Sequence, residues 1–261
     1  MTSKSILLLL AALLLAFATT AQAQNEPWGP LTVLSRTDID STTELAFLGL
    51  SNHNKPNGRM YRLRQSIPAD LPAFVPRTLG NQNLVIADPT PDGWLCLYKG
   101  PFPMDNANCS YTATLVSDMN RLTFSLDLNQ FLSRPTDLEI QDIRYLDGKL
   151  FFNEACQSYS SQADGDCSAL VCMNPFLPQV LWRTPNLTSN NILIMHKGVI
   201  ICGYGFTAEP DYLYLVDAAT GSILSATELD SAHDYLEIQG DKLYVTTYKS
   251  LYTFQLPAPM R

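Results

Sequence analysis

The sequence IRYLDGKLFF at residues 143–152 joins two short apolar strands through a turn that contains Gly148. The same pattern returns around KGVII at residues 197–201 and again as YLEIQGDKLY at residues 235–244. The glycines of these three turns lie 50 and 42 residues apart. A repeat of this length is typical of β-propellers and other repeat arrays. The pattern therefore predicts an architecture and says little about chemistry.

Each repeat unit is predicted to contain four short strands, rich in aromatic and β-branched residues and separated by Gly, Pro, Asn and Asp. No long amphipathic helical stretch follows residue 23. The five predicted sets of strands are 31–35, 44–50, 59–65 and 74–79; 84–87, 94–99, 111–117 and 122–126; 142–146, 150–155, 168–174 and 179–184; 192–195, 199–204, 212–217 and 222–228; and 235–238, 243–247 and 251–256.

Five such units predict an all-β fold, a five-bladed β-propeller of four-stranded antiparallel blades. The last unit has only three predicted strands, so its outer edge needs a partner. We expect the N-terminal segment at residues 25–30, which contains Trp28, to supply that strand. Stacked β-sandwich domains are the alternative, but the regular spacing of the turns favours blades.

Residues 1–23 have the features of a cleavable export signal. Lys4 precedes an apolar run at residues 6–18, which is too short to span a bilayer with ease, and Ala21-Gln22-Ala23 is a small-x-small cleavage site. We therefore expect a mature chain of one propeller domain, residues 24–261, that is secreted or periplasmic and bacterial. An uncleaved membrane anchor would need a longer apolar run, and no transmembrane segment is expected in the mature chain.

The formal net charge of −8 and the isoelectric point near 4.8 argue against nucleic acid as a partner. Phosphate backbones are bound by basic surfaces, which this composition does not provide. The expected partner is a protein, a peptide or a glycan.

Six cysteines in an oxidising compartment are expected to be at least partly paired. Cys156 and Cys167 flank a polar loop, and Cys96 and Cys109 flank another, so we predict one disulfide across each loop. The pairing of Cys172 and Cys202, which lie inside apolar strands, stays open. No CxxC motif is present, and no metal site is predicted.

Residues 212–224, YLYLVDAATGSIL, run from a strand into a turn of the form Asp-x-x-Thr-Gly. Asp217 and Thr220 can bond nearby backbone groups, and Gly221 can adopt positive φ. This stretch resembles the repeat of pyrroloquinoline-quinone-type propellers, in which a Trp often follows the next strand. Val180-Leu181-Trp182 is similar to that feature in the preceding unit, whereas the later unit has Leu224-Ser225-Ala226.

The resemblance covers about two units well, and it implies the fold rather than an activity. Quinone-dependent dehydrogenases of this type are much longer chains with adjacent cysteines and a calcium-quinone site. Because this chain has no Cys-Cys pair, pyrroloquinoline quinone is not expected, and no cofactor is predicted.

Four loops longer than a minimal hairpin, at residues 51–58, 100–108, 157–166 and 205–210, are expected on one face of the propeller. Their acidic and aromatic composition suits a cation, a sugar or a basic peptide, although ordinary solvated loops have a similar composition. The predicted binding residues are Tyr159, Asp164, Asp166, Tyr204, Phe206, Glu209 and Asp211, and the same loops also carry His53, Phe102 and Asp105.

Catalytic motifs are incomplete in this sequence. The three histidines, His53, His196 and His233, are scattered and are expected on the surface, and no Gly-x-Ser-x-Gly elbow occurs. Asp142 and Asp234 start predicted inner strands, so a pair of carboxylates at the central channel, as in some five-bladed glycosidases, is the catalytic alternative.

We therefore predict an exported, non-catalytic propeller that binds a protein, peptide or glycan partner on its long-loop face. The alternatives are a five-bladed carbohydrate-active hydrolase and a structural subunit of an envelope complex.

Overall fold

The structure, a computed structural model, describes residues 28–39, 44–45, 50–51, 67–101, 109–117, 119, 121–157, 159–206 and 208–257. In these ranges the regular structure is almost entirely antiparallel β-sheet, with two short 3-10 helices, η4 (Leu128–Phe131) and η5 (Ser160–Ala163). No helix in this part of the chain is long and apolar enough to cross a membrane. The predicted export signal, residues 1–23, lies outside the described residues.

Three sheets follow the order of the chain, and each is named here by its inner strand. The β5 blade contains β4 (Thr78–Leu79), β5 (Gln82–Thr90), β6 (Gly93–Gly100), β7 (Ser110–Val116) and β8 (Leu122–Asp127). The β10 blade contains β10 (Ile143–Leu146), β11 (Lys149–Cys156), β12 (Ala169–Asn174) and β13 (Gln179–Arg183), and β9 (Leu138–Glu139) pairs with the end of β11. The β14 blade contains β14 (Asn190–His196), β15 (Val199–Tyr204), β16 (Asp211–Asp217) and β17 (Ile223–Leu229).

The fourth sheet, the β18 blade, combines the two ends of the described chain. It contains β18 (His233–Gln239), β19 (Lys242–Thr247), β20 (Ser250–Gln255) and, at its outer edge, β1 (Thr32–Asp38). The register of β1 on β20 runs from Thr32 opposite Gln255 to Asp38 opposite Ser250. The predicted completion of the last blade by the N-terminal part of the chain is therefore confirmed, although the strand is 32–38 and not 25–30.

The first predicted unit is wrong where the structure describes it. Residues 31–35, predicted to start that unit, belong to β1 of the β18 blade, and β4 pairs with β5 of the next unit. Strands β2 (Glu44–Leu45) and β3 (Leu50–Ser51) pair with each other, while residues 59–65 lie outside the described ranges. The count of five blades therefore stays a prediction.

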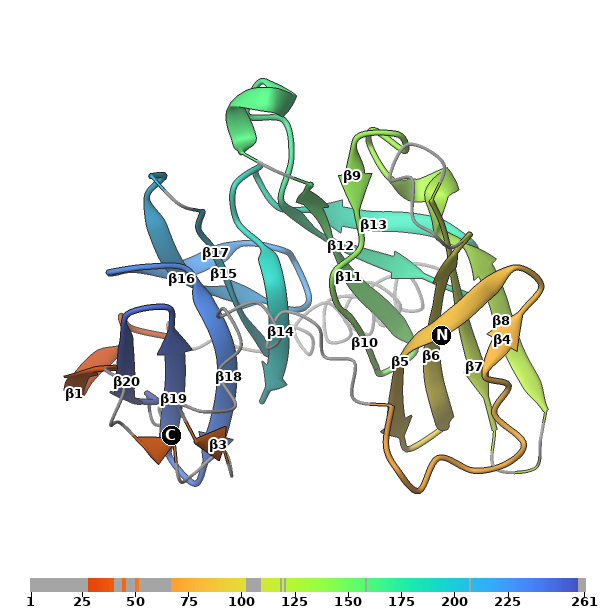
Figure 1. Cartoon of the computed structure of the whole chain (residues 1–261), viewed down its shortest axis with the longest axis horizontal. Coiled ribbons are helices and arrows are strands. Elements are labelled where there is room, and N and C mark those ends of the chain that lie inside the picture. Colours follow the sequence, from red (N-terminus) through yellow and green to blue (C-terminus); the bar gives the residue numbers. More distant parts are fainter. Residues whose placement is uncertain are drawn as a thin grey trace, which may run out of the picture.

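The four blades fan about a common axis, which is the arrangement of a β-propeller (Figure 1). Strand β5 contacts β10, β10 contacts β14, and β14 contacts β18, so the inner strands of successive blades are neighbours. In Figure 1 the β18 blade and the β5 blade form the two sides of the arc, with the β14 and β10 blades between them.

The apolar core lies between neighbouring blades, because alternate residues of a strand face opposite sides of its sheet. On β11, Phe152 packs into the cluster shared with the β5 blade, whereas Phe151 packs into the cluster shared with the β14 blade. A third cluster joins the β14 and β18 blades. Full burial of a side chain such as Phe152, which is 0% exposed, contributes about 1.5–3 kcal/mol.

Buried amide side chains join the inner strands across blade boundaries. Asn153 Nδ2 donates to the carbonyl of Asn191 at 2.7 Å, and Asn191 Nδ2 donates to the carbonyl of His233 at 2.8 Å. The His233 ring lies 2.9 Å from the carbonyl of Ile192 and is fully buried. The predicted surface position of His233 is therefore wrong, because its ring packs against Gly203, where a Cβ atom would clash with it.

The glycine turns that predicted the repeat are confirmed. Gly93, Gly148, Gly198 and Gly240 all have positive φ, at 132°, 73°, 79° and 64°. The Asp-x-x-Thr-Gly turn also forms as expected: Asp217 Oδ1 accepts from two backbone N–H groups at 2.8 Å. Gly221 at φ 76° lies directly under the Trp182 ring of the preceding blade, so that turn also contributes to blade packing.

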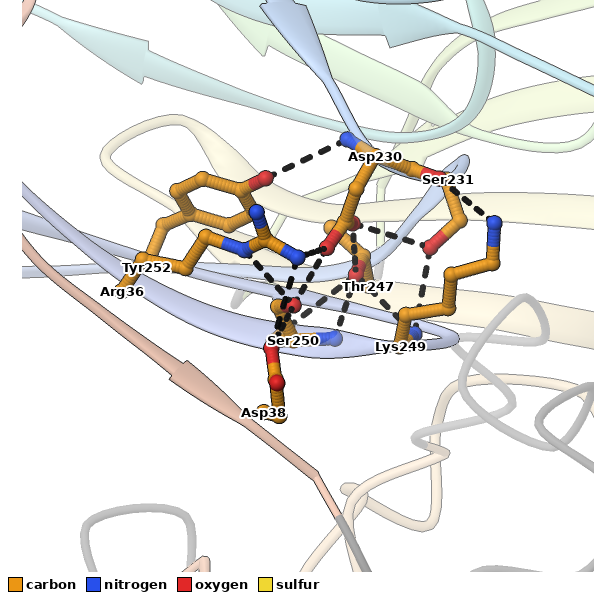
Figure 2. A network of polar contacts seen from close by, with 8 residues as sticks. All are labelled: Arg36, Asp38, Asp230, Ser231, Thr247, Lys249, Ser250 and Tyr252. Atoms are coloured by element: carbon orange, nitrogen blue, oxygen red, sulfur yellow. Dashed lines mark hydrogen bonds and ion pairs between the residues drawn. The ribbon is translucent and has the colours of Figure 1, made fainter.

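A polar network fixes β1 on the β18 blade (Figure 2). Arg36 on β1 forms an ion pair with Asp230 at 2.8 Å, and its guanidinium lies 5.7 Å from the centre of the Tyr252 ring. Asp230 also accepts hydrogen bonds from the hydroxyls of Ser250, Thr247 and Ser231. Although partial burial acts to raise it, these hydroxyls and Arg36 hold the pKa of Asp230 below its ordinary value.

Candidate binding site on the loop face

The loops of two neighbouring blades meet on the face that carries the long connections. The β11–β12 loop places Tyr159 against Phe206 of the β15–β16 loop, with ring centres 4.8 Å apart in an edge-to-face arrangement. The backbone N–H and the hydroxyl of Ser160 both donate to Glu209 Oε1 at 2.9 Å, and the Tyr204 hydroxyl donates to Glu209 Oε2. These five residues are called the loop cluster below.

Tyr204 and Glu209, which the sequence predicted to bind a ligand, form hydrogen bonds within the loop cluster. Tyr204 is only 4% exposed. Burial, together with its hydrogen bond to Glu209, raises the pKa of Tyr204. Both oxygens of Glu209 accept hydrogen bonds from within the protein. Glu209 therefore joins two blades through Ser160, and Tyr204 holds Glu209 from within its own blade.

The other predicted acidic residues, Asp164, Asp166 and Asp211, form none of the loop-cluster contacts given above. Asp164 is exposed and ends η5 in the left-handed region, and Asp166 accepts from Asn186 Nδ2 at 2.6 Å. Asp211 is half-buried with its Oδ1 close to Gly205, and this oxygen has no hydrogen-bond partner among the described residues. Burial raises the pKa of Asp211 to about 6. His53, Phe102 and Asp105 lie outside the described residues.

The predicted disulfide between Cys156 and Cys167 is present, with the two Cα atoms 5.2 Å apart. It closes the base of the loop that carries Tyr159 and Ser160. The loop is therefore held at its base by a covalent bond and toward its tip by hydrogen bonds to the next blade.

The predicted pairing of Cys96 with Cys109 is wrong, because both are free thiols. Cys96 packs with Leu84 and Tyr98 on one face of the β5 blade, whereas Cys109 packs with the cluster on the other face. A disulfide between thiols on opposite faces of a sheet cannot form. Cys172 and Cys202 are also free and buried, and burial raises the pKa of Cys172 to about 11 and of Cys202 to about 12.

A polar cavity of about 240 Å³ opens beside the disulfide and is called the loop-face cavity below. Arg134 pairs with Asp137 at 2.6 Å and donates to the carbonyl of Ala163 at 2.9 Å, so its side chain is fixed at the wall. The other lining groups include two amides and a phenol ring, from Gln157, Gln162 and Tyr159.

Of this lining, the sequence predicted Tyr159 as a binding residue and Cys156 as half of a disulfide. Gln157 and Gln162 belong to the predicted loop at 157–166, but amides gave no signal beside the acidic and aromatic residues. Arg134 and Asp137 come from the connection between the β5 and β10 blades, which ends at β9. In a blade of four antiparallel strands, the connection to the next blade lies on the same face as the loop between the second and third strands, and that topology is the signal that could have found Arg134 and Asp137.

The catalytic alternative depends on Asp142, which is fully buried in the structure. Both of its oxygens pair with the Arg144 guanidinium at 2.7 Å, and both also accept a backbone N–H, from Ile143 and Leu193, at 2.9 Å. A carboxylate so completely bonded suits structural support better than proton transfer. Asp234 lies on β18 and is 3% exposed. No group of three His, Cys, Asp or Glu side chains in the described part of the chain is arranged to hold a metal ion.

No protein-family model matches the chain. No curated protein matches it in sequence. The resemblance of residues 212–224 to pyrroloquinoline-quinone-type repeats therefore stays a prediction, while the propeller fold is shown by the blades themselves.

Several solved structures are similar to this chain. BamB from Moraxella catarrhalis matches with a TM-score of 0.44 and 12% identity over 67% of this chain and 44% of that one. A chain of the mitotic checkpoint complex matches with a TM-score of 0.42 and 8% identity, over 67% and 63% of the two chains. Glutaminyl cyclase from Myxococcus xanthus matches with a TM-score of 0.38 and 13% identity, over 68% and 74%.

The matched region spans less than two thirds of the first two of these structures. At such low identity and TM-score, the similarity says nothing about activity or partners.

Proposed function

We propose that this protein is an exported, non-catalytic propeller that binds a glycan through the loop-face cavity. The observation that carries the proposal is a polar cavity built beside a disulfide and next to a loop cluster that joins two blades.

The loops around this cavity are held in place before any ligand arrives. The Cys156–Cys167 disulfide closes the loop at its base, and Glu209 of the next blade binds Ser160. Binding to an ordered site costs less conformational entropy than binding to loops that must first be ordered. The hydrogen bonds of the loop cluster thus support a binding role by fixing the loop that carries Tyr159.

The lining groups suit a sugar. Sugar hydroxyls donate and accept hydrogen bonds, and the amides of Gln157 and Gln162 offer both functions. The half-exposed Tyr159 ring, at 38% exposure, offers an apolar surface for the C–H face of a pyranose. Because a site for a whole drug-sized ligand has about 300–1,000 Å³, a cavity of about 240 Å³ suits one sugar unit of a larger glycan.

The chemistry of the described residues favours binding over catalysis, because Asp142 is bonded to Arg144 and two backbone N–H groups. The disulfide agrees with an oxidising compartment, and the predicted signal at residues 1–23 points to the same place. The net charge of −8 disfavours nucleic acid as the partner.

The proposal is tested on glycan and peptide arrays with the mature protein, residues 24–261. The test variant combines Tyr159→Ala with Gln162→Ala, and the control is Met119→Ala, which is 72% exposed on the β5 blade. We expect defined glycans to bind the wild type and the control, and to lose at least tenfold in affinity with the double variant.

A thermal unfolding midpoint within about 4 °C of the wild type would show that the double variant is folded. Unchanged glycan binding by this folded variant would contradict the cavity as the site. Binding to peptides alone would assign the protein a polypeptide partner and overturn the glycan proposal.

A further inference from the structure

A second cavity, of about 430 Å³, lies on the opposite side of the blades from the loop-face cavity. It is lined by the ends of the inner strands β5 and β10 nearest the β5–β6 and β10–β11 turns, and by β14. Because inner strands border the central axis of a propeller, this cavity lies at the mouth of the channel. It is called the channel-mouth cavity below.

The walls of the channel-mouth cavity combine apolar and polar groups in about equal measure. Leu146, Ile194 and Met195 line it and are only partly buried, so apolar surface of the inner strands stays in contact with water. Removing such surface from water favours the binding of an apolar group. The volume also falls in the range of about 300–1,000 Å³ that is usual for small-molecule sites.

The charged side chains that line this cavity are Asp88 and Arg144. Arg144 forms a two-bond ion pair with Asp142 and a second pair with Asp88, at 2.9 Å. One guanidinium thus faces two carboxylates. Asp142 is fully buried, whereas the side chain of Asp88 is 19% exposed and lines the cavity, so Asp88 is the carboxylate that a ligand in this cavity can reach.

We propose that the channel-mouth cavity binds an organic cation, an ammonium or guanidinium group carried on an apolar body. The cation lies against Asp88, and the apolar body packs against Leu146, Ile194 and Met195. A free amine and a basic side chain of a peptide share this chemistry. This site is separate from the loop-face cavity and does not depend on the proposed glycan function.

Isothermal titration calorimetry with 4-phenylbutylamine tests the proposal on the mature protein. The matched ligand is 4-phenylbutanoic acid, which has the same apolar body and the opposite charge. We expect the amine to bind at least tenfold more tightly than the acid, and its affinity to fall as salt is added, because Asp88 is partly exposed to solvent.

The peptide N-acetyl-Leu-Lys-Leu-amide distinguishes the two sources of the cation. Tighter binding of this peptide than of the amine would point to a polypeptide ligand, and tighter binding of the amine would point to a free small molecule. Both results support the proposed chemistry. Failure of both to bind, or binding of the acid as tightly as the amine, would overturn it.

Two variants locate the site. Asp88→Asn removes the accessible negative charge while Arg144 keeps its pair with Asp142, and Met195→Lys places a cation on the wall. Each should weaken amine binding by about tenfold, since two close charges near a protein surface interact strongly.

Met195→Gln is the neutral control at the same position, and Met119→Lys adds the same charge on an exposed site outside the cavity lining. Both controls should keep amine affinity within about threefold of the wild type. Unchanged amine binding by folded Asp88→Asn would overturn the proposal even if Met195→Lys does not fold.

Discussion

The two faces of this propeller differ in how they use their polar residues. On the loop face, Glu209 is bonded to Ser160 of the neighbouring blade's loop and to Tyr204 at the end of β15, and the cavity beside them is lined by other residues. The opposite face carries the short β5–β6 and β10–β11 turns. There the inner strands leave the larger channel-mouth cavity, with Asp88 at its wall. Long loops therefore indicate where a chain can bind, while the contacts among their side chains determine which residues are available.

The largest expected effect concerns the buried charges behind the channel-mouth cavity. Asp142→Ala leaves the buried Arg144 with Asp88 as its remaining carboxylate partner. Breaking a buried pair in this way typically lowers the free energy of unfolding by about 3–5 kcal/mol. Urea unfolding followed by circular dichroism measures the change. The exposed Glu228→Ala on β17 is the control, with an expected change below about 0.5 kcal/mol.

If Asp142→Ala unfolds at the same urea concentration as the wild type, the carboxylate does not stabilise the fold. The hydrolase alternative would then regain support, because a carboxylate kept for catalysis need not contribute to stability.

The next largest effect is expected on the loop face. Replacing both Cys156 and Cys167 by Ser opens a loop whose ends are 11 residues apart in sequence. Closure of a loop of this size stabilises a protein by about 2–3 kcal/mol on the chain-entropy argument. We expect that loss in urea unfolding, and a loss of glycan binding that exceeds any change in amine binding at the other face. Equal losses at both faces would show that the two sites are not independent.

The smallest effect is a pH dependence on the loop face. Burial raises the pKa of Asp211 from 3.8 to about 6; the charge of Lys249 acts against this rise, and the charges of Asp230 and Glu209 add to it. The folded state then binds this proton more tightly than the unfolded state, so the free energy of unfolding falls as pH rises from about 4 to about 6.

Asp211→Asn should remove this dependence and should be more stable than the wild type at pH 7, by a small amount because the carboxyl is half-exposed. Thermal unfolding at pH 4, 5, 6 and 7 measures it. A variant that is less stable than the wild type at pH 7 would show that ionised Asp211 stabilises the fold.

Much of the fold could be predicted from the sequence, because the glycine turns and strand residues have local signals. Gly148, Gly198 and Gly240 adopt the expected positive φ, and the strands around them agree closely with the predicted ranges. The partner of a strand has no such signal. Residues 32–38 were correctly read in part as β-structure, but their pairing with β20, more than 200 residues away, depends on the closure of the ring.

The candidate site was less predictable for a related reason. Glu209 looks like a solvated acidic residue until the next blade brings Ser160 to it, and His233 looks like a surface histidine until Gly203 provides space for its ring. The failure of the Cys96 and Cys109 pairing was avoidable, because strand alternation places the two thiols on opposite faces of the β5 blade.

The most direct test of the loop cluster is a double-mutant cycle between Ser160→Ala and Glu209→Ala, measured by urea unfolding. The wild type, both single variants and the double variant give the interaction free energy of the pair. Since the Ser160 hydroxyl donates to a carboxylate of the next blade at 2.9 Å, we predict a coupling of about 1 kcal/mol. Additive effects, with a coupling near zero, would contradict the conclusion that the Ser160 side chain and Glu209 bind each other across the two blades.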